Sequence, residues 1–128
     1  MKNLFILLTL VFAPILSQAQ GFATVSLQPQ ARNQYYDYNF GSVPVNFQQS
    51  VDFELKAIGT EPTLIRTIFA FGQGFTNASN CPRILMPGRT CTTRVYFWPP
   101  YQGFYNGQLR FDLQESQIFI NLSGWGRL

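Results

Sequence analysis

Apolar and polar residues alternate along most of this chain with the period of two that is typical of half-buried β-strands. The pattern is cleanest over residues 49–58, where Asp52, Glu54 and Lys56 alternate with apolar residues. A helix would scatter those apolar residues around its circumference, so the pattern favours a strand. The side chains predicted to point inward are Val51, Phe53, Leu55 and Ala57.

A second clear strand is predicted over residues 91–98, after a turn that Pro87 and Gly88 indicate. Pro99 and Pro100 end this strand, because a residue without an N–H group cannot continue a hydrogen-bonded ladder. The inward set is Cys91, Thr93, Val95 and Phe97, and the outward set is Thr92, Arg94, Tyr96 and Trp98.

The same alternation predicts further strands over residues 21–28, 63–71, 104–113 and 117–124, and around Tyr36, Tyr38 and Phe40, which share one face. After residue 71, Gly72 and Gly74 predict a bulge or a short crossing segment through Phe75, and residues 77–80 are predicted to form a loop. Turn signals recur roughly every ten residues, and no helix is expected beyond the amino-terminal segment. About seven or eight antiparallel strands spaced in this way predict an all-β, immunoglobulin-like β-sandwich.

The amino-terminal segment has the pattern of a secretory signal peptide. Lys2 precedes an apolar run over residues 4–16, and Ser17 and Ala19 are small residues at the two positions that a signal peptidase recognises. A membrane anchor is the alternative, but the run is short for a span and Pro14 interrupts it. We therefore expect a cleaved signal peptide over residues 1–19, one exported domain over residues 20–128, and no membrane span in the mature chain.

Export places the mature chain in an oxidising compartment, either the periplasm or the extracellular space. The chain has two cysteines, Cys81 before the Pro87–Gly88 turn and Cys91 after it, and a disulfide between them is predicted. Two buried free thiols are the alternative. Metal binding is a weaker one, because the chain contains no histidine and these two cysteines stand alone. No cofactor is expected.

Composition narrows the class of partner. The formal net charge of +3 includes Lys2, and 12% of the residues are charged. The charges are spread along the chain, without a basic tract that would indicate binding to nucleic acid or to anionic lipid. Aromatic residues make up 16% of the chain, which suits a β-rich core with some aromatic side chains left for the surface.

Short motifs occur in order along the chain, at residues 39–45 (NFGSVPV), 85–91 (LMPGRTC), 95–99 (VYFWP), 103–109 (GFYNGQL) and 122–126 (LSGWG). They resemble the "FGSV.V", "L.PG..C", "V.F.P", "G...G.L" and "LSG.G" signatures of ASH domains, which also occur in bacterial choice-of-anchor D surface proteins. Cys81 takes the place of the upstream cysteine of that family. The resemblance covers most of the mature chain.

The resemblance implies a seven-stranded immunoglobulin-like sandwich, related in shape to major sperm protein and to the PapD pilus chaperone. Family members act mostly as binding or spacer modules, and the family has no active site to transfer. Two turns depart from its pattern. Residues 57–60 replace the usual "N-T-G", and Asn46 replaces a customary glycine. Both departures lie in turns, so they concern the local shape of these loops rather than the fold.

Catalysis is disfavoured by composition. Without histidine, the chain cannot form a Ser–His or Cys–His nucleophile pair. Two carboxylates would suffice for glycoside hydrolysis, but the candidates lie at outward strand positions or in turns, where solvated surface charges are usual. These candidates are Asp37, Asp52, Glu54, Glu61, Asp112 and Glu115. We expect that the protein is not an enzyme.

Outward-facing aromatic residues are the candidate functional feature. In an immunoglobulin topology the strand over residues 104–113 lies between the strands over 63–71 and 117–124, which would bring Phe69 or Phe71 beside Phe119, with Arg110 between them. Aromatic side chains around an arginine are typical of protein-binding hot spots, and a sugar-stacking platform is the alternative. A third interpretation is that they only cover the edges of the core. The candidate partner-binding residues are Phe69, Phe71, Tyr96, Trp98, Arg110, Phe119 and Trp125.

The sequence therefore predicts a non-catalytic module that contacts another protein of the cell envelope. Open sheet edges offer edge-strand pairing as one route, including self-association. Binding to a carbohydrate or to the cell wall through the aromatic side chains is the alternative function.

Overall fold

The computed structural model of the chain describes residues 23–128. The predicted signal peptide and the first two residues of the strand predicted over 21–28 lie outside this range. Within it, the chain forms β-strands joined by turns and loops, with no helix, so the all-β class is confirmed. None of these residues forms a helix with the length and apolar character needed to cross a membrane.

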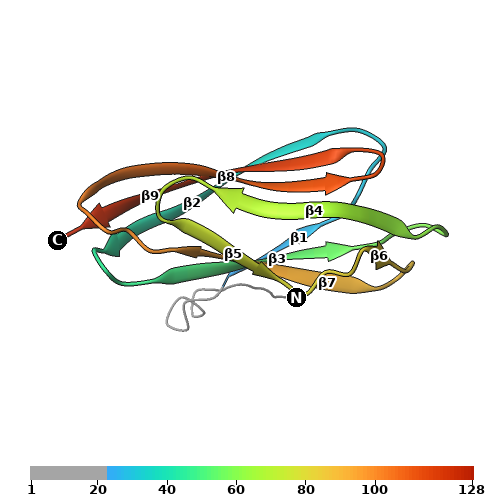
Figure 1. Ribbon diagram of the computed structural model, residues 1–128, viewed down its shortest axis with the longest axis horizontal. Coiled ribbons are helices and arrows are strands. Elements are labelled where there is room, and N and C mark those ends of the chain that lie inside the picture. Colours follow the sequence, from blue (N-terminus) through green and yellow to red (C-terminus); the bar gives the residue numbers. More distant parts are fainter. Residues whose placement is uncertain (1–22) are drawn as a thin grey trace, which may run out of the picture.

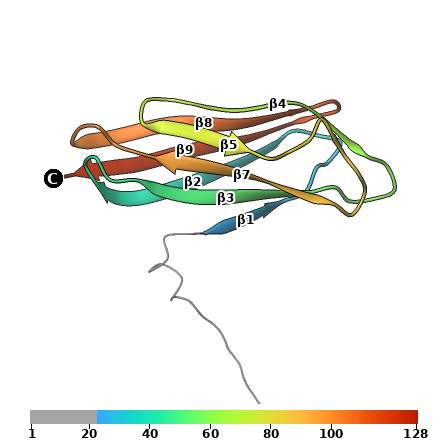
Figure 2. The same cartoon turned by 60° about the horizontal axis from the view of Figure 1, so that its bottom comes forward.

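The described strands make two sheets that extend along the long axis of the molecule (Figure 1; Figure 2). The four-stranded sheet has the order β1 (Thr24–Leu27), β3 (Gln49–Lys56), β7 (Thr90–Phe97) and β5 (Phe75–Ser79). The five-stranded sheet has the order β2 (Gln34–Pro44), β9 (Gln117–Arg127), β8 (Gly103–Leu113), β4 (Thr63–Phe71) and β6 (Ile84–Leu85).

The prediction of seven or eight antiparallel strands is wrong in two respects. The described residues form nine strands, because β6 and β5 are additional short strands. Two of the pairings are parallel, β1 with β3 and β2 with β9. β1 belongs to the four-stranded sheet and β2 to the five-stranded sheet, so the chain crosses between the sheets in the segment that connects them.

The loop predicted over residues 77–80 is also wrong, because residues 77–79 belong to β5. The crossing segment expected through Phe75 is present, since β4 lies in one sheet and β5 in the other. Asn77 stabilises the crossing, because its side-chain oxygen accepts a hydrogen bond from Ala70 N at 3.0 Å. Asn and Ser are turn-forming residues, and pairing with β7 overrides that preference.

Side chains from both sheets fill one core. The inward sets predicted for β3 and β7 are buried. Every second residue along much of β8 and β9 is buried as well: Leu109, Phe111, Leu113, Ile118, Ile120 and Leu122. Phe97 lies at the centre of an aromatic group, with ring centroids 4.9 Å from Phe75, 5.4 Å from Phe40 and 5.6 Å from Tyr105. Since Phe40 and Tyr105 belong to the opposite sheet, this group joins the two layers.

The predicted disulfide between Cys81 and Cys91 is present. Cys91 begins the inward set of β7, and Cys81 packs against the same core from the segment between β5 and β6. Next to it, the buried Thr93 hydroxyl donates a hydrogen bond to Ser79 Oγ at 2.9 Å. The disulfide therefore fastens an otherwise irregular segment to a central strand, and it indicates an oxidising, exported environment.

The turn between β2 and β3 has an unusual backbone conformation. Asn46 has a φ of 69°, in the left-handed region, and Phe47 N donates to Pro44 O at 3.0 Å to close the turn. Asparagine tolerates this conformation better than most other residues with a Cβ, which explains how a residue other than glycine stands at this position.

We expect Asn46→Ala to destabilise the protein by about 1 kcal/mol, because alanine is strained at the positive φ of this position. Asn46→Gly is the matched control and should be neutral or slightly stabilising. Urea unfolding curves followed by circular dichroism measure both. Equal stability of the alanine and glycine variants would contradict this account of the turn.

Candidate binding surfaces

A row of four side chains crosses the outer face of the five-stranded sheet. The register places Phe69 of β4 opposite Arg110 of β8, Arg110 opposite Phe119 of β9, and Phe119 opposite Tyr35 of β2. Side chains that are directly opposite on neighbouring strands point to the same face and touch. We name these four residues the Arg110 row.

Arg110 lies between aromatic rings within this row. Its guanidinium carbon is 5.0 Å from the ring centroid of Phe119 and 5.7 Å from those of Phe69 and Phe71. These are distances at which a cation is attracted to the face of a ring. Beyond Phe119, Tyr35 stacks on it with centroids 5.1 Å apart and planes inclined by 11°. The predicted neighbourhood of Phe69, Phe71, Arg110 and Phe119 is thus present.

A second row, of hydrogen-bonded polar side chains, lies next to the Arg110 row. Arg110 Nη2 donates to Gln108 Oε1 at 3.3 Å, and Gln108 Nε2 donates to Asn121 Oδ1 at 3.1 Å. Asn121 Nδ2 then donates to Asp37 Oδ1 at 3.1 Å, so the bonds cross β8, β9 and β2. Each of these side chains holds its neighbour, which fixes the rotamers of the face before any partner arrives.

One hydrogen-bond donor of Arg110 has no acceptor. Among the described residues, its Nε is the buried side-chain nitrogen or oxygen atom that has no hydrogen-bond partner. A buried donor without an acceptor costs free energy, and a native structure retains it where something else compensates or where a ligand completes the site. Here the three surrounding rings compensate in part.

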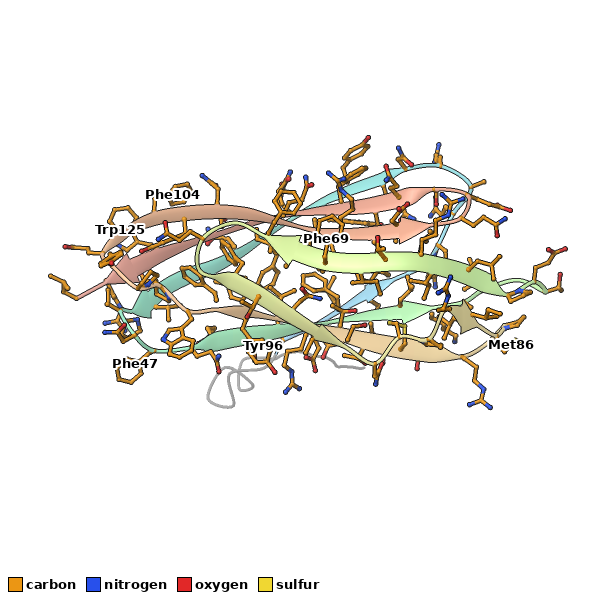
Figure 3. The ribbon with its side chains drawn as sticks, viewed as in Figure 1. Phe47, Phe69, Met86, Tyr96, Phe104 and Trp125 are labelled. Atoms are coloured by element: carbon orange, nitrogen blue, oxygen red, sulfur yellow. A yellow bond between two sulfur atoms is a disulfide. The ribbon has the colours of Figure 1, made fainter. Side chains whose placement is uncertain are left out.

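The other predicted residues do not join this row. Tyr96 is on the outer face of the four-stranded sheet, opposite Ser50 and Thr76, as the label in Figure 3 shows. Trp98 follows β7 at one end of the molecule, and Trp125 lies at the same end, opposite Phe104. The predicted aromatic residues therefore belong to separate surfaces.

A second exposed aromatic cluster occupies that end. Its five side chains come from the β2–β3 turn, the segment between β7 and β8, and the adjoining ends of β8 and β9. We name it the aromatic tip, and its members are Phe47, Trp98, Tyr101, Phe104 and Trp125.

Sequence analysis missed Tyr35 and three members of the aromatic tip. Tyr35 stands beside Phe119 only because β2 runs parallel to β9, a long-range pairing with no local signal. Phe47 and Tyr101 lie in or next to turns, outside any regular alternation, and Phe104 lies at the start of the strand predicted over residues 104–113. One local signal could have indicated their exposure. Phe47 follows Asn46, and Tyr101 and Phe104 lie close to Gly103, and turn residues of this kind place neighbouring side chains in solvent.

The carboxylates lie where the sequence predicted. Asp52 forms a bidentate ion pair with Arg94 on the outer face of the four-stranded sheet, with Arg94 Nε 2.6 Å from Oδ1 and Nη2 3.1 Å from Oδ2. The hydrogen bond to Asp52 raises the pKa of Arg94 above its usual value, and burial raises that of Tyr38.

Within residues 23–128, no group of three or more His, Cys, Asp or Glu side chains is placed to hold a metal ion.

A cleft of about 410 Å³ lies at the end of the molecule opposite the aromatic tip. It is bounded by the β1–β2, β3–β4 and β8–β9 connections, and Glu61 and Glu115 are among its lining residues. The cleft is polar and open to solvent. The hydroxyl of Ser116, on its wall, donates a hydrogen bond to Gln30 O at 2.6 Å.

No protein-family model matches the chain. No curated protein matches it significantly. Solved structures are similar in fold. A family 123 glycoside hydrolase from Clostridium perfringens has a TM-score of 0.58 and 8% identity, over 70% of this chain and 22% of that one. The VesB protease of Vibrio cholerae has a TM-score of 0.55 and 15% identity, over 70% of this chain and 30% of that one.

The secreted serine protease VesC from Vibrio cholerae has a TM-score of 0.54 and 12% identity, over 69% of this chain and 21% of that one. At these identities the likeness concerns the fold alone. The chain spans from 21% to 30% of the length of these three proteins, so it is similar to one part of each larger protein.

Proposed function

We propose that the chain is an exported, non-catalytic immunoglobulin-like module that binds another protein of the cell envelope through the Arg110 row. The sheet order, with β2 parallel to β9, and the resemblance to ASH domains support the immunoglobulin-like assignment. The disulfide supports export. The observation that carries the proposal is the arginine held among aromatic rings on an exposed sheet face.

The chemistry of the row suits a protein partner. Tyrosine and arginine are enriched in the few interface residues that contribute most of the binding free energy. Tyr35 is 68% exposed and Phe69 is 40% exposed, so the outer members of the row are accessible. The stacked rings and the neighbouring hydrogen bonds already fix the side chains, which lowers the entropy that binding would otherwise cost.

The stacking disfavours the carbohydrate alternative at this surface. A sugar ring packs on the open face of an aromatic ring. Because β9 lies between β2 and β8, Phe119 has Tyr35 against one face and Arg110 against the other. Phe119 therefore presents an edge, rather than a face, to solvent, and a ring edge next to an arginine favours contacts to a protein surface.

Edge-strand pairing offers a second mode of contact, including self-association. The strands at the ends of the two sheets are β1 and β5 in one and β2 and β6 in the other. β2 is the longest of these, with 11 residues, and it carries Tyr35. A strand added to β2 would therefore lie beside the Arg110 row, so both modes would use one surface.

The proposal is tested by photo-crosslinking followed by affinity measurement. A photoreactive residue replaces Tyr35 in the exported chain, in the cells that naturally make it, and replaces Tyr96 on the opposite face as the control. The protein that forms an adduct only from position 35 is identified and purified. Binding of the chain to it is then measured by calorimetry.

We expect Arg110→Ala and Phe119→Ala each to weaken this binding by about 30-fold or more, because truncation of a hot-spot residue costs at least about 2 kcal/mol. Tyr96→Ala is the matched control and should change the affinity by less than about two-fold. Adducts of equal yield from both positions, or equal weakening by all three variants, would contradict the proposed surface. An adduct with the chain itself would show that the partner is a second copy.

A further inference from the structure

The aromatic tip is unusually exposed for large apolar side chains. The exposed fractions are 65% for Phe47, 56% for Trp98, 69% for Tyr101, 59% for Phe104 and 44% for Trp125. Isolated exposed apolar residues are normal, but a group of them gathered at one place marks an interaction surface. The proposed contact through the Arg110 row does not use these five residues.

Backbone hydrogen bonds hold the segments of the tip together. Asn46 N donates to Pro99 O at 2.9 Å, and Val45 N donates to Arg127 O at 2.8 Å. Trp98 N donates to Gly74 O at 2.8 Å, which ties the β7–β8 segment to the β4–β5 crossing. The aromatic side chains therefore extend from a rigid base rather than from separate mobile loops.

The tip surrounds the end of the molecule. In Figure 3, Phe47 lies on one side of this end, and Phe104 and Trp125 lie on the other. A protein partner docking on one side would cover one part of the group and leave the rest in water. Immersion of the whole end in an apolar layer would cover all of it.

The charge distribution fits such immersion. The segments that form this end, residues 44–48, 72–74, 98–104 and 125–128, carry one charged side chain, that of Arg127. All six acidic residues lie outside these segments, and Glu61 and Glu115 line the cleft at the opposite end. No carboxylate side chain would thus have to leave water, and the one cation complements the phosphate groups of lipids.

We propose that the aromatic tip inserts into the interface of a phospholipid bilayer. Tryptophan and tyrosine favour the boundary between headgroups and acyl chains, where one part of the ring is apolar and the other part is hydrated. The long axis of the molecule then points away from the membrane surface. Phe119 lies six residues from Trp125 along β9, so the Arg110 row is held about 20 Å above the inserted end, accessible to a protein partner.

The two tryptophans of the chain, Trp98 and Trp125, both belong to the tip, so tryptophan fluorescence reports on it alone. The exported chain, purified as its own cells process it, is mixed with vesicles of phosphatidylcholine, and with vesicles that also contain phosphatidylglycerol. We expect that the vesicles shift the tryptophan emission to shorter wavelength and that lipids with brominated acyl chains quench it. We also expect the protein to float with the vesicles in a density gradient. Anionic lipid should raise the partition coefficient by no more than about five-fold, because one arginine is involved.

Phe47→Ser together with Tyr101→Ser should lower the partition coefficient at least about ten-fold, because two apolar anchors are lost while both reporters stay. Phe69→Ser together with Phe71→Ser is the control, at two side chains that are 40% and 45% exposed on the outer face of the five-stranded sheet, and it should leave partition unchanged. Circular dichroism confirms that both double variants are folded. Absence of quenching and flotation overturns the proposal. A spectral shift that depends on protein concentration without vesicles also overturns it and assigns the tip to an interface between copies.

Discussion

Phe97→Ala is expected to destabilise the fold by about 3–5 kcal/mol, as other deletions of a large aromatic side chain from a core do. Phe97 is fully buried, and it contacts rings from both sheets, Phe75 in its own and Phe40 and Tyr105 in the other. Its removal leaves a cavity between the layers that none of these rings can fill without changing its rotamer. Since domains of this size are stable by about 5–15 kcal/mol, the variant should lose roughly a fifth of its stability or more.

Equilibrium unfolding in guanidinium chloride, followed by far-ultraviolet circular dichroism, measures this effect. Phe104→Ala is the matched control, because Phe104 is also a phenylalanine within a strand, opposite Trp125, but is 59% exposed. This variant should change the stability by less than about 0.5 kcal/mol. If the two variants had similar midpoints, the packing of the sheets around Phe97 would be refuted.

Two glycines on β8 and β9 owe their place to this same aromatic group. A Cβ on Gly124 would lie 2.4 Å from the ring of Phe97, and a Cβ on Gly107 would lie 2.6 Å from the ring of Phe75. Both glycines belong to the short motifs noted in the sequence, Gly107 to residues 103–109 and Gly124 to residues 122–126. The motif residues are therefore explained by packing: a bulky aromatic ring from one sheet needs a position without a side chain on the facing strand.

The inward faces of the long strands were predictable from sequence because they depend on a local property. In β3 every second residue is apolar, and burial of one face follows directly from the geometry of a strand, as Val51 and Phe53 show. The neighbourhood of Arg110 was also predictable, but it needs the order of the strands in the sheet in addition to the alternation. Once Phe69, Arg110 and Phe119 are assigned to outward positions, the order of three antiparallel strands brings them together.

What the sequence could not predict depends on pairing between distant segments. β5 contains Asn77 and Ser79, which favour turns, and it is a strand because the exposed edge of β7 accepts it. Tyr35 completes the Arg110 row only after β2 has paired in parallel with β9. The aromatic tip needs the ends of several strands to converge. The place of Tyr35 in the Arg110 row and the aromatic tip as a whole thus depend on long-range contacts, for which local periodicity carries no signal.

Removal of the disulfide is expected to cost about 2–3 kcal/mol, the largest effect after loss of Phe97. The two cysteines are ten residues apart in sequence, and closing a loop of that length restricts the unfolded chain by about this amount in the chain-entropy model. The variant is Cys81→Ala together with Cys91→Ala, because Cys91 is 4% exposed and serine would bury an additional hydroxyl. The guanidinium midpoint should fall, and the slope of the transition should rise slightly, because the unfolded chain is less compact.

The native protein unfolded in the presence and absence of a thiol reductant is the control that keeps every side chain. If the stabilisation comes from restricting the unfolded chain, the reduced protein and the double alanine variant should lose similar amounts of stability. A loss in the alanine variant alone would instead assign the effect to the side chains that pack around Cys91 and Thr93. Equal midpoints for the oxidised protein, the reduced protein and the variant would contradict a stabilising role for the bond. The segment from Asn80 to β6 would then hold its place through hydrogen bonds alone, such as the one from Thr92 N to Asn80 Oδ1 at 2.8 Å.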